Sequence, residues 1–215
     1  MIPLSPNGLP DGSGDQVIRG TGRRRLLDAA ATVYMSDGPR LCSVRRVCAA
    51  AGVSTGTLFH HFPAGVRDLQ AATYLTARSE YQGGILSALA RRGPAKHAVM
   101  AAVRFQFEWV QANTAVAFYL DFFNSKWLLD RYLSELTDMD RVYASAVADW
   151  RQRCGNALLP VTLHDLLYMS LLLAPARLYA LERARACPSN LADHLRRAAP
   201  QFEQAAWRAV ASAEA

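Results

Sequence analysis

The segment from Ser43 to Phe62, SVRRVCAAAGVSTGTLFHHF, constrains the fold of this 215-residue chain more than any other. Ser43 is a good N-cap for a helix. Gly52 stands where that helix would end, because glycine adopts the left-handed backbone of a helix C-terminus without steric cost. Ser54 then caps a second short helix, with Val53 before it as part of a hydrophobic staple. The sequence therefore predicts two short helices joined by a tight turn, as in a helix-turn-helix.

The second of these helices carries small or polar residues on its outward side. A helix that enters the major groove of DNA presents such residues to the base edges, and Thr55 and Thr57 are the candidates for base contact. His61 and Phe62 are expected to pack inside the domain instead. The residues expected to contact DNA are Arg40, Ser43, Arg45, Arg46, Ser54, Thr55, Gly56, Thr57, Phe59 and His60.

Three consecutive stretches resemble the N-terminal domain of the tetracycline-repressor (TetR) family of transcriptional regulators, over about Arg24 to Leu69. They are LLDAAATVYMSDG as a first helix, SVRRVCAAAGVS as a second and TGTLFHHFP as the recognition helix. The agreement of three elements in order and spacing is more specific than a lone helix-turn-helix pattern. Three positions differ from the family. Phe59 stands where a tyrosine often reaches a phosphate, Val66 stands where a lysine contacts the DNA backbone, and Cys48 replaces a common alanine.

The resemblance implies an all-α protein, with an N-terminal three-helix helix-turn-helix DNA-binding domain followed by a helical bundle that binds a ligand and dimerises. We expect a disordered tail at residues 1–22, the DNA-binding domain at 23–69 and the regulatory domain at 70–215. The implied function is that of a repressor. A homodimer binds a palindromic operator on double-stranded DNA, and a small apolar or amphipathic effector releases it. A net charge of +6 suits such a polyanionic partner.

Periodic apolar residues between glycine and proline breaks predict the remaining helices. A stripe from Leu129 to Trp150 recurs at three- and four-residue steps, as on a buried helix face. Pro175 is expected to kink the helix that contains it, and Gly83-Gly84 to weaken another. The helices are expected at Arg24–Ser36, Val66–Ala90, Ala95–Ala112, from Asn113 or Thr114 onward, at 126–155 as one long helix or two shorter ones, at Thr162–Ala186 and at Asn190–Ala213.

Aromatic residues are most dense between Phe105 and Tyr143, and pockets between helices are mostly apolar with few polar groups. Core packing is the more common role for any one aromatic residue, whereas the cluster as a whole favours a pocket. Gln106, Glu108, Asp121 and Asn124 are the polar candidates for orienting a ligand. The residues expected to line the pocket are Phe105, Trp109, Phe118, Phe122, Phe123, Trp127 and Tyr143.

The last two helices are expected to form a four-helix bundle across the two-fold axis of the dimer. Some of their apolar residues must instead pack within their own subunit, and the sequence does not sort the two groups. The candidates for the dimer interface are Leu173, Leu178, Leu181, Phe202, Ala206 and Val210.

Other classes of protein have less support in the sequence. It contains no nucleophile elbow, phosphate-binding loop, zinc-protease or dinucleotide motif, so we expect neither an enzyme nor a cofactor or metal site. No signal peptide or apolar stretch long enough to span a bilayer is visible, which predicts a cytoplasmic protein without a membrane partner. Phe59 and Val66 raise one alternative, a co-regulator of the same fold with impaired DNA binding. An uncharacterised enzyme is a more distant one.

Overall fold

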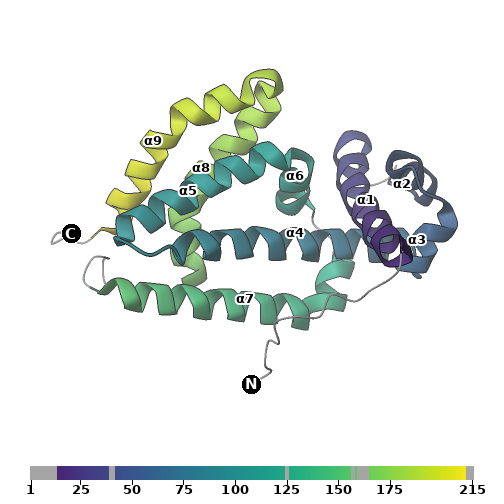
Figure 1. Cartoon of the computed structure of the whole chain (residues 1–215), viewed down its shortest axis with the longest axis horizontal. Helices are drawn as coiled ribbons and strands as arrows, with labels where there is room; N and C mark the ends of the chain where they lie inside the picture. The colour runs from purple at the N-terminus through teal and green to yellow at the C-terminus, as the bar shows by residue number, and fades with distance from the viewer. Residues whose placement is uncertain (1–13, 39–41, 124–125, 156–157, 159–164, 212–215) are drawn as a thin grey trace. The chain divides into compact units, whose positions relative to one another are not determined.

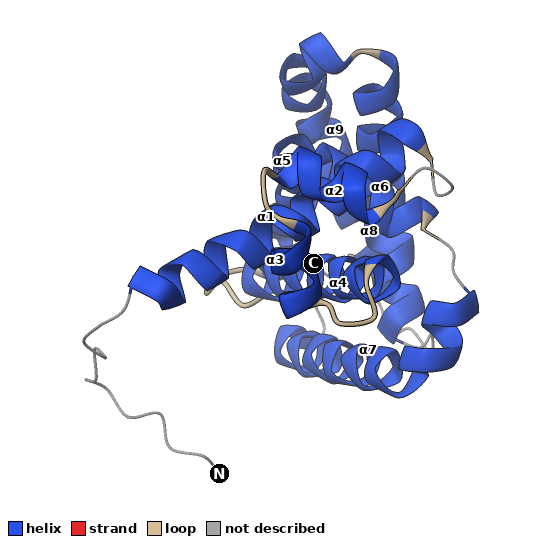
Figure 2. Cartoon of the chain, turned by 90° about the vertical axis from the view of Figure 1, so that its right-hand side faces the viewer, coloured by secondary structure: helices blue, strands red, loops and turns tan. Residues whose placement is uncertain are grey.

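The computed structural model describes residues 14–38, 42–123, 126–155, 158 and 165–211. Over these residues the chain is built from helices, with no β-strand element (Figure 2), so the predicted all-α fold is confirmed. The chain divides after Gln70 into two compact units. None of the helices in the described part is long and apolar enough to cross a membrane.

The first unit contains three helices: α1 (Gly14–Asp37), α2 (Val44–Ala51) and α3 (Thr55–His61). Helix α1 packs against both of the shorter helices, which also pack against each other. Side chains with no exposed surface fill the space between them, among them Leu26, Val47 and Leu58. This small core holds α2 and α3 in the order and spacing that their caps predict.

Helix α1 begins earlier than expected. Residues 14–22 belong to it, so the disordered tail predicted through residue 22 is too long, while residues 1–13 lie outside the described residues. The last proline of this region is Pro10. The glycines beyond it each cost only about 1 kcal/mol in a helix, which does not stop a helix from extending out of a packed and already formed segment.

The second unit holds most of α4 and all the later helices, and α4 itself starts in the first unit. Helix α5 packs against α8 and α9, and α8 also packs against α6, α7 and α9 (Figure 1). The helices are α4 (Val66–Leu89), α5 (Ala95–Ala112), α6 (Thr114–Phe122), α7 (Lys126–Cys154), α8 (Asp165–Ala186) and α9 (Leu191–Val210), with a 3-10 turn at Pro188–Asn190.

Helix α7 is interrupted at Tyr132, whose φ of −120° and ψ of 23° are not helical. Leu129 and Leu133, on either side of this interruption, are 48% and 61% exposed, and the buried stripe predicted from Leu129 to Trp150 is wrong at these two positions. Tyr143, Val147 and Trp150, beyond the interruption, are buried as part of the core.

The adjacent glycines of α4 have opposite surroundings. A Cβ atom added at Gly84 would lie 1.9 Å from Cζ of Phe105 on α5, whereas one added at Gly83 would have no neighbour within 4 Å. Gly84 therefore permits a close approach of Phe105 to α4, and Gly83 has no such role in packing.

These surroundings predict opposite effects of the same substitution on stability. We expect Gly84→Ala to lower the free energy of unfolding by about 1–3 kcal/mol, because the Phe105 ring must move out of a packed position. Gly83→Ala should raise it by up to about 1 kcal/mol through helix propensity alone. Urea denaturation of the two variants measures the difference. Equal effects would contradict the packing role of Gly84, and a Phe105→Ala background should remove its cost.

Candidate DNA-binding surface and effector cavity

The caps of α2 have the geometry that the sequence predicts. Ser43 is extended, with φ −116° and ψ 158°, and its Oγ accepts a hydrogen bond from the backbone N–H of Arg46 at 3.5 Å. Gly52 ends the helix in the left-handed conformation at φ 60° and donates to the carbonyl of Ala49 at 3.2 Å. These two caps limit α2 to two turns and set the direction in which the chain leaves it.

Ser54 caps α3 in the same manner, because its Oγ accepts from the backbone N–H of Thr57 at 3.1 Å. The thiol of Cys48 donates to the carbonyl of Ser54 at 3.7 Å, and this buried contact joins α2 to the start of α3. Leu58 and Phe62 are 0% and 4% exposed. These two side chains pack into the core of the first unit beneath α3, so the packing role predicted for Phe62 is confirmed.

The opposite side of α3 is open to solvent. Thr55, Gly56 and His60 are exposed, Thr57 is half-buried, and Phe59 is 48% exposed although it is a large apolar side chain. The structure thus places the predicted contact residues of α3 on one accessible surface. Arg40, a weaker candidate in the preceding loop, lies outside the described residues.

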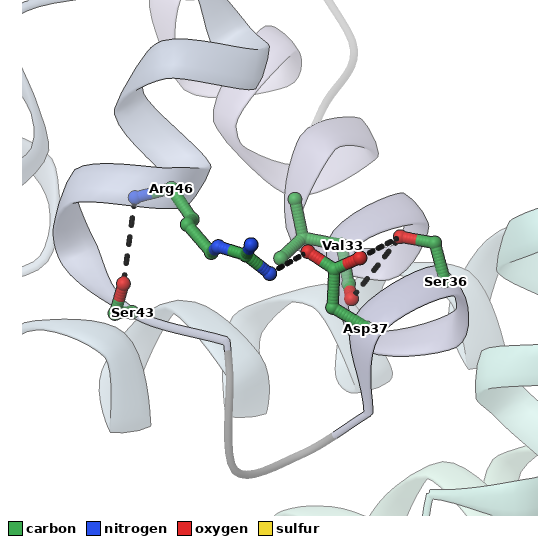
Figure 3. Close-up of polar contacts among 5 residues, drawn as sticks. All are labelled: Val33, Ser36, Asp37, Ser43 and Arg46. Carbon is green, nitrogen blue, oxygen red and sulfur yellow. Dashed lines mark hydrogen bonds and ion pairs between the residues drawn. The ribbon is translucent and has the colours of Figure 1, made fainter.

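The two arginines in the first turn of α2 have different environments. Arg46 forms an ion pair with Asp37 at the end of α1, and Ser36 donates to the other oxygen of that carboxylate at 3.1 Å (Figure 3). Arg45 is exposed. Because Arg46 already neutralises a carboxylate of its own chain, Arg45 is the stronger candidate for contact with a phosphate.

Arg25 of α1 was not anticipated from the sequence. Its Nη2 donates to the carbonyl of Gly52 at 3.2 Å, where the unpaired carbonyls of α2 carry partial negative charge. A Cβ atom added at Gly52 would lie 2.6 Å from that same nitrogen. The partners are 27 residues apart, so no local pattern indicates the contact.

The second unit encloses a cavity of about 510 Å³ between α4, α6, α7 and α8. We call it the central cavity. Its walls combine aromatic, charged and apolar side chains. The lining residues are Tyr74, Arg78, Tyr81, Gln82, Leu120, Asp121, Asp140, Tyr143, Met169, Leu173, Ala174 and Arg177.

Two ion pairs cross the central cavity between helices. Arg78 of α4 donates to Asp140 of α7 at 2.5 Å and to the hydroxyl of Tyr74 at 3.1 Å. Arg177 of α8 donates through Nε to Asp121 of α6 at 3.0 Å. Each pair therefore places one positive and one negative group in the cavity wall.

The guanidinium of Arg177 also lies over the ring of Tyr81, 4.4 Å from its centroid. Burial by itself lowers the pKa of Arg177, but its interactions with Tyr81 and Asp121 raise that pKa by more, so the net shift is upward. Burial is the main cause that raises the pKa of Tyr81, and the same holds for Tyr143. At neutral pH the cavity thus keeps a charged guanidinium beside protonated phenols.

Gln106 of α5 supports this wall from behind. Its side chain has no exposed surface, accepts from the hydroxyl of Tyr81 at 2.6 Å and donates to the carbonyl of Leu173 at 2.9 Å. Both polar ends of the amide are therefore used within the protein, and Gln106 positions Tyr81 without lining the cavity itself.

Of the seven aromatic residues expected to line a pocket, the structure places only Tyr143 on the wall of the central cavity. The side chain of Phe122 lies outside the described ones. Phe105 and Trp109 pack against Tyr81, Phe123 stacks on Tyr119, Trp127 contacts Tyr132, and Phe118 packs against the core.

The rings of those five residues pack against neighbouring side chains, which is the more common role of an aromatic side chain in a helical core, and their role in a pocket stays a prediction. Of the four polar candidates, Asp121 lies on the cavity wall and Gln106 lies just behind it. Glu108 is exposed at another hollow, between α5 and α9, and Asn124 lies outside the described residues.

The structure also separates the six candidates for the dimer interface. Leu173, Leu181, Ala206 and Val210 are buried in the core of their own subunit, which favours a role in packing within the subunit for these four. Phe202 packs against Phe107, with ring centroids 5.6 Å apart. Leu178 is 64% exposed and remains a candidate.

A capped helix-turn-helix with an accessible polar second helix is typical of DNA-binding transcriptional regulators. Comparison with known proteins bears on the helix-turn-helix unit. Residues 26–64 match the model of the bacterial regulatory proteins of the tetR family. The first unit thus carries a DNA-binding domain of the TetR type.

Individual relatives agree with this assignment. The chain is 42% identical over 60 residues to the HTH-type transcriptional repressor KstR2 of Rhodococcus jostii (strain RHA1), and the matched part spans 27% of each protein. A TetR family regulator from Marinobacter aquaeolei VT8 has the same fold, with a TM-score of 0.68 and 17% identity over 92% of this chain and 99% of that one. FadR from Bacillus subtilis, solved in complex with stearoyl-CoA, has a TM-score of 0.64 and 13% identity, covering 85% and 96%.

Proposed function

We propose that the protein is a homodimeric repressor that binds a palindromic operator through α3 and is released by a small amphipathic effector in the central cavity. The observation that carries the proposal is the surface of α3, where Thr55, Gly56 and His60 are exposed while Leu58 is fully buried. A short helix whose inner face is packed against the domain and whose outer face is polar can enter a major groove without unfolding. The curated relative KstR2 is itself a repressor.

Within this proposal the roles of the DNA-binding residues follow from their positions. Thr55 and Thr57, in the first turn of α3, read base edges or a thymine methyl group. Ser43 and Arg45, at the start of α2, contact phosphates and fix the orientation of the domain on the duplex. His60 lies one turn further along and donates to a base or a phosphate.

The effector acts by binding one conformation of the dimer more tightly than the other, which shifts the population away from the form that docks on DNA. The central cavity supplies the volume, and α4 contributes Tyr74, Arg78 and Tyr81 to its wall. The same helix begins at Val66, inside the first unit. A solved relative in complex with stearoyl-CoA supports an amphipathic molecule as the class of effector.

A single α3 reads too few base pairs for genomic specificity, so a symmetric pair of subunits is part of the proposal. Leu178 projects from α8 with 64% of its surface exposed, and we assign it to the interface. Phe202, Leu181 and the other buried candidates would then stabilise α8 and α9 from within each subunit.

Selection of binding sites from random duplex oligonucleotides tests the proposal. We expect the protein to enrich a palindrome whose half-sites are about 10 base pairs apart, or a multiple of that distance. A Leu178→Asp variant should sediment as a monomer and lose the palindromic preference, because two carboxylates would meet at the two-fold axis. A Glu182→Asp variant on the same helix is the control. Enrichment of no sequence would instead favour the co-regulator with impaired DNA binding.

A further inference from the structure

A second hollow, of about 360 Å³, lies between α4 and α7. We call it the α4–α7 groove. Gln82 and Tyr143 line both the groove and the central cavity, so the two hollows are neighbours that share part of their walls. A Cβ atom at Gly83 would meet nothing within 4 Å, which shows open space beside this glycine on the groove.

The two hollows differ in chemistry. The central cavity contains two arginines, two aspartates and three tyrosines. The α4–α7 groove is lined largely by apolar side chains, Leu86, Met139 and Val142, and Val142 is 63% exposed. A charged compartment thus lies beside an apolar groove, and a molecule that fills both must have a polar end and an apolar end.

The hydrogen-bonding state of the arginines indicates the polar end. Among the described residues, Nε of Arg78 is buried and makes no hydrogen bond, whereas Nη2 of Arg177 lies 2.5 Å from a carboxylate oxygen of Asp121 as an ion pair. A guanidinium has five N–H donors and no acceptor. The Arg78 side of the cavity therefore has a donor without an acceptor, and a head group with acceptor oxygens complements it.

We propose that the effector is an elongated amphiphile with an acidic head, a carboxylate or a phosphate, held by Arg78 and Arg177, and with an apolar chain lying in the α4–α7 groove. This proposal rests on the proposed function, which places an effector in the central cavity. The acidic head competes with Asp140 for Arg78, and binding thereby loosens the ion pair that joins α4 to α7.

Titration of the full chain with matched probes tests the head and the chain separately. Dodecanoate, dodecanol and dodecyltrimethylammonium carry one chain and three head groups, and each is used below its critical micelle concentration. We expect dodecanoate to bind about 10- to 100-fold more tightly than the other two, since a hydrogen bond to a charged group is lost in each. Octanoate should bind more weakly than dodecanoate, by about fourfold for each methylene that the groove covers.

Two substitutions locate the site. Gly83→Leu fills the groove and should weaken dodecanoate binding at least tenfold while leaving octanoate nearly unchanged. Gly83→Ala, its matched control, should change neither, because it removes the same glycine but adds only one methyl group. Arg78→Gln should weaken dodecanoate about tenfold or more and leave dodecanol unaffected. Circular dichroism checks that each variant is folded.

The outcomes separate this proposal from the repressor proposal. Dodecanoate binding that obeys both substitutions supports the inference even if bound DNA is not released, and that result would count against the effector-release step alone. Equal affinity for the three head groups, or dodecanoate affinity that is unchanged by Gly83→Leu, overturns the inference. A protein that binds its operator normally but binds none of the probes also overturns it.

Discussion

The Thr55→Glu variant is expected to lose about 100-fold or more in affinity for duplex DNA while keeping its stability. Thr55 is the first residue of α3 and is exposed. In the proposed complex a carboxylate at this position faces the electronegative major groove of the DNA. Placing like charges next to each other costs several kcal/mol of binding free energy. In the free protein the same carboxylate lies at a helix N-terminus, which stabilises it by about 0.3–1 kcal/mol.

A matched variant separates this local effect from the change in net charge. Ser145→Glu adds the same charge at an exposed position of α7, in the second unit. It should reduce DNA affinity only slightly, through long-range electrostatics that salt screens. Fluorescence anisotropy with a labelled duplex at two salt concentrations measures both variants. Similar losses in the two would argue that α3 is not the surface that meets DNA.

The Leu58→Ala variant is expected to lower the free energy of unfolding of the first unit by about 2–5 kcal/mol. Leu58 has no exposed surface and lies on the inner side of α3. Removing its methyl groups loses the transfer free energy of a buried side chain and leaves a cavity that the short helices cannot close. Hydrogen exchange of the α2 and α3 amides reports this local loss directly.

The neighbouring Phe59→Ala variant is the control, because Phe59 is 48% exposed on the same helix. Its effect on stability should stay within about 0.5 kcal/mol, as for most surface substitutions. Any loss of DNA affinity in this variant then reports a contact of the ring with DNA and not a change of fold. If Leu58→Ala proves as mild as Phe59→Ala, the packing described for α3 is wrong.

Much of the helix-turn-helix could be predicted because its signals are local. Ser43, Gly52 and Ser54 each act on backbone groups within four residues of themselves, so the sequence contains all the participants. The start of α4 at Val66 and both ends of α5 follow in the same way from the breaks beside them. The disordered tail was predicted to extend too far, through residue 22, because glycines weaken a helix without ending it.

The candidate cavity could not be predicted to the same extent, because its defining contacts join distant parts of the chain. Asp140 lies 62 residues beyond Arg78, and Arg177 lies 56 residues beyond Asp121. Aromatic density indicated α6 and α7 but not α4 and α8, and it could not show that Phe105 would fill the space left by Gly84 or that Tyr143 would face the cavity. Similarly, an apolar residue such as Leu173 or Leu178 has the same sequence signature whether it meets its own core or solvent.

The caps of α2 and α3 and the polar surface of α3 were therefore readable from the order of residues alone, since each depends on a few neighbours along the chain. Only the packed structure showed which ion pairs form, Arg78 with Asp140 and Arg177 with Asp121. The same holds for the packing of Phe105 against Gly84 and for the exposure of Leu178. Packing brings together faces that are far apart in sequence, and the energy of each contact depends on which faces meet.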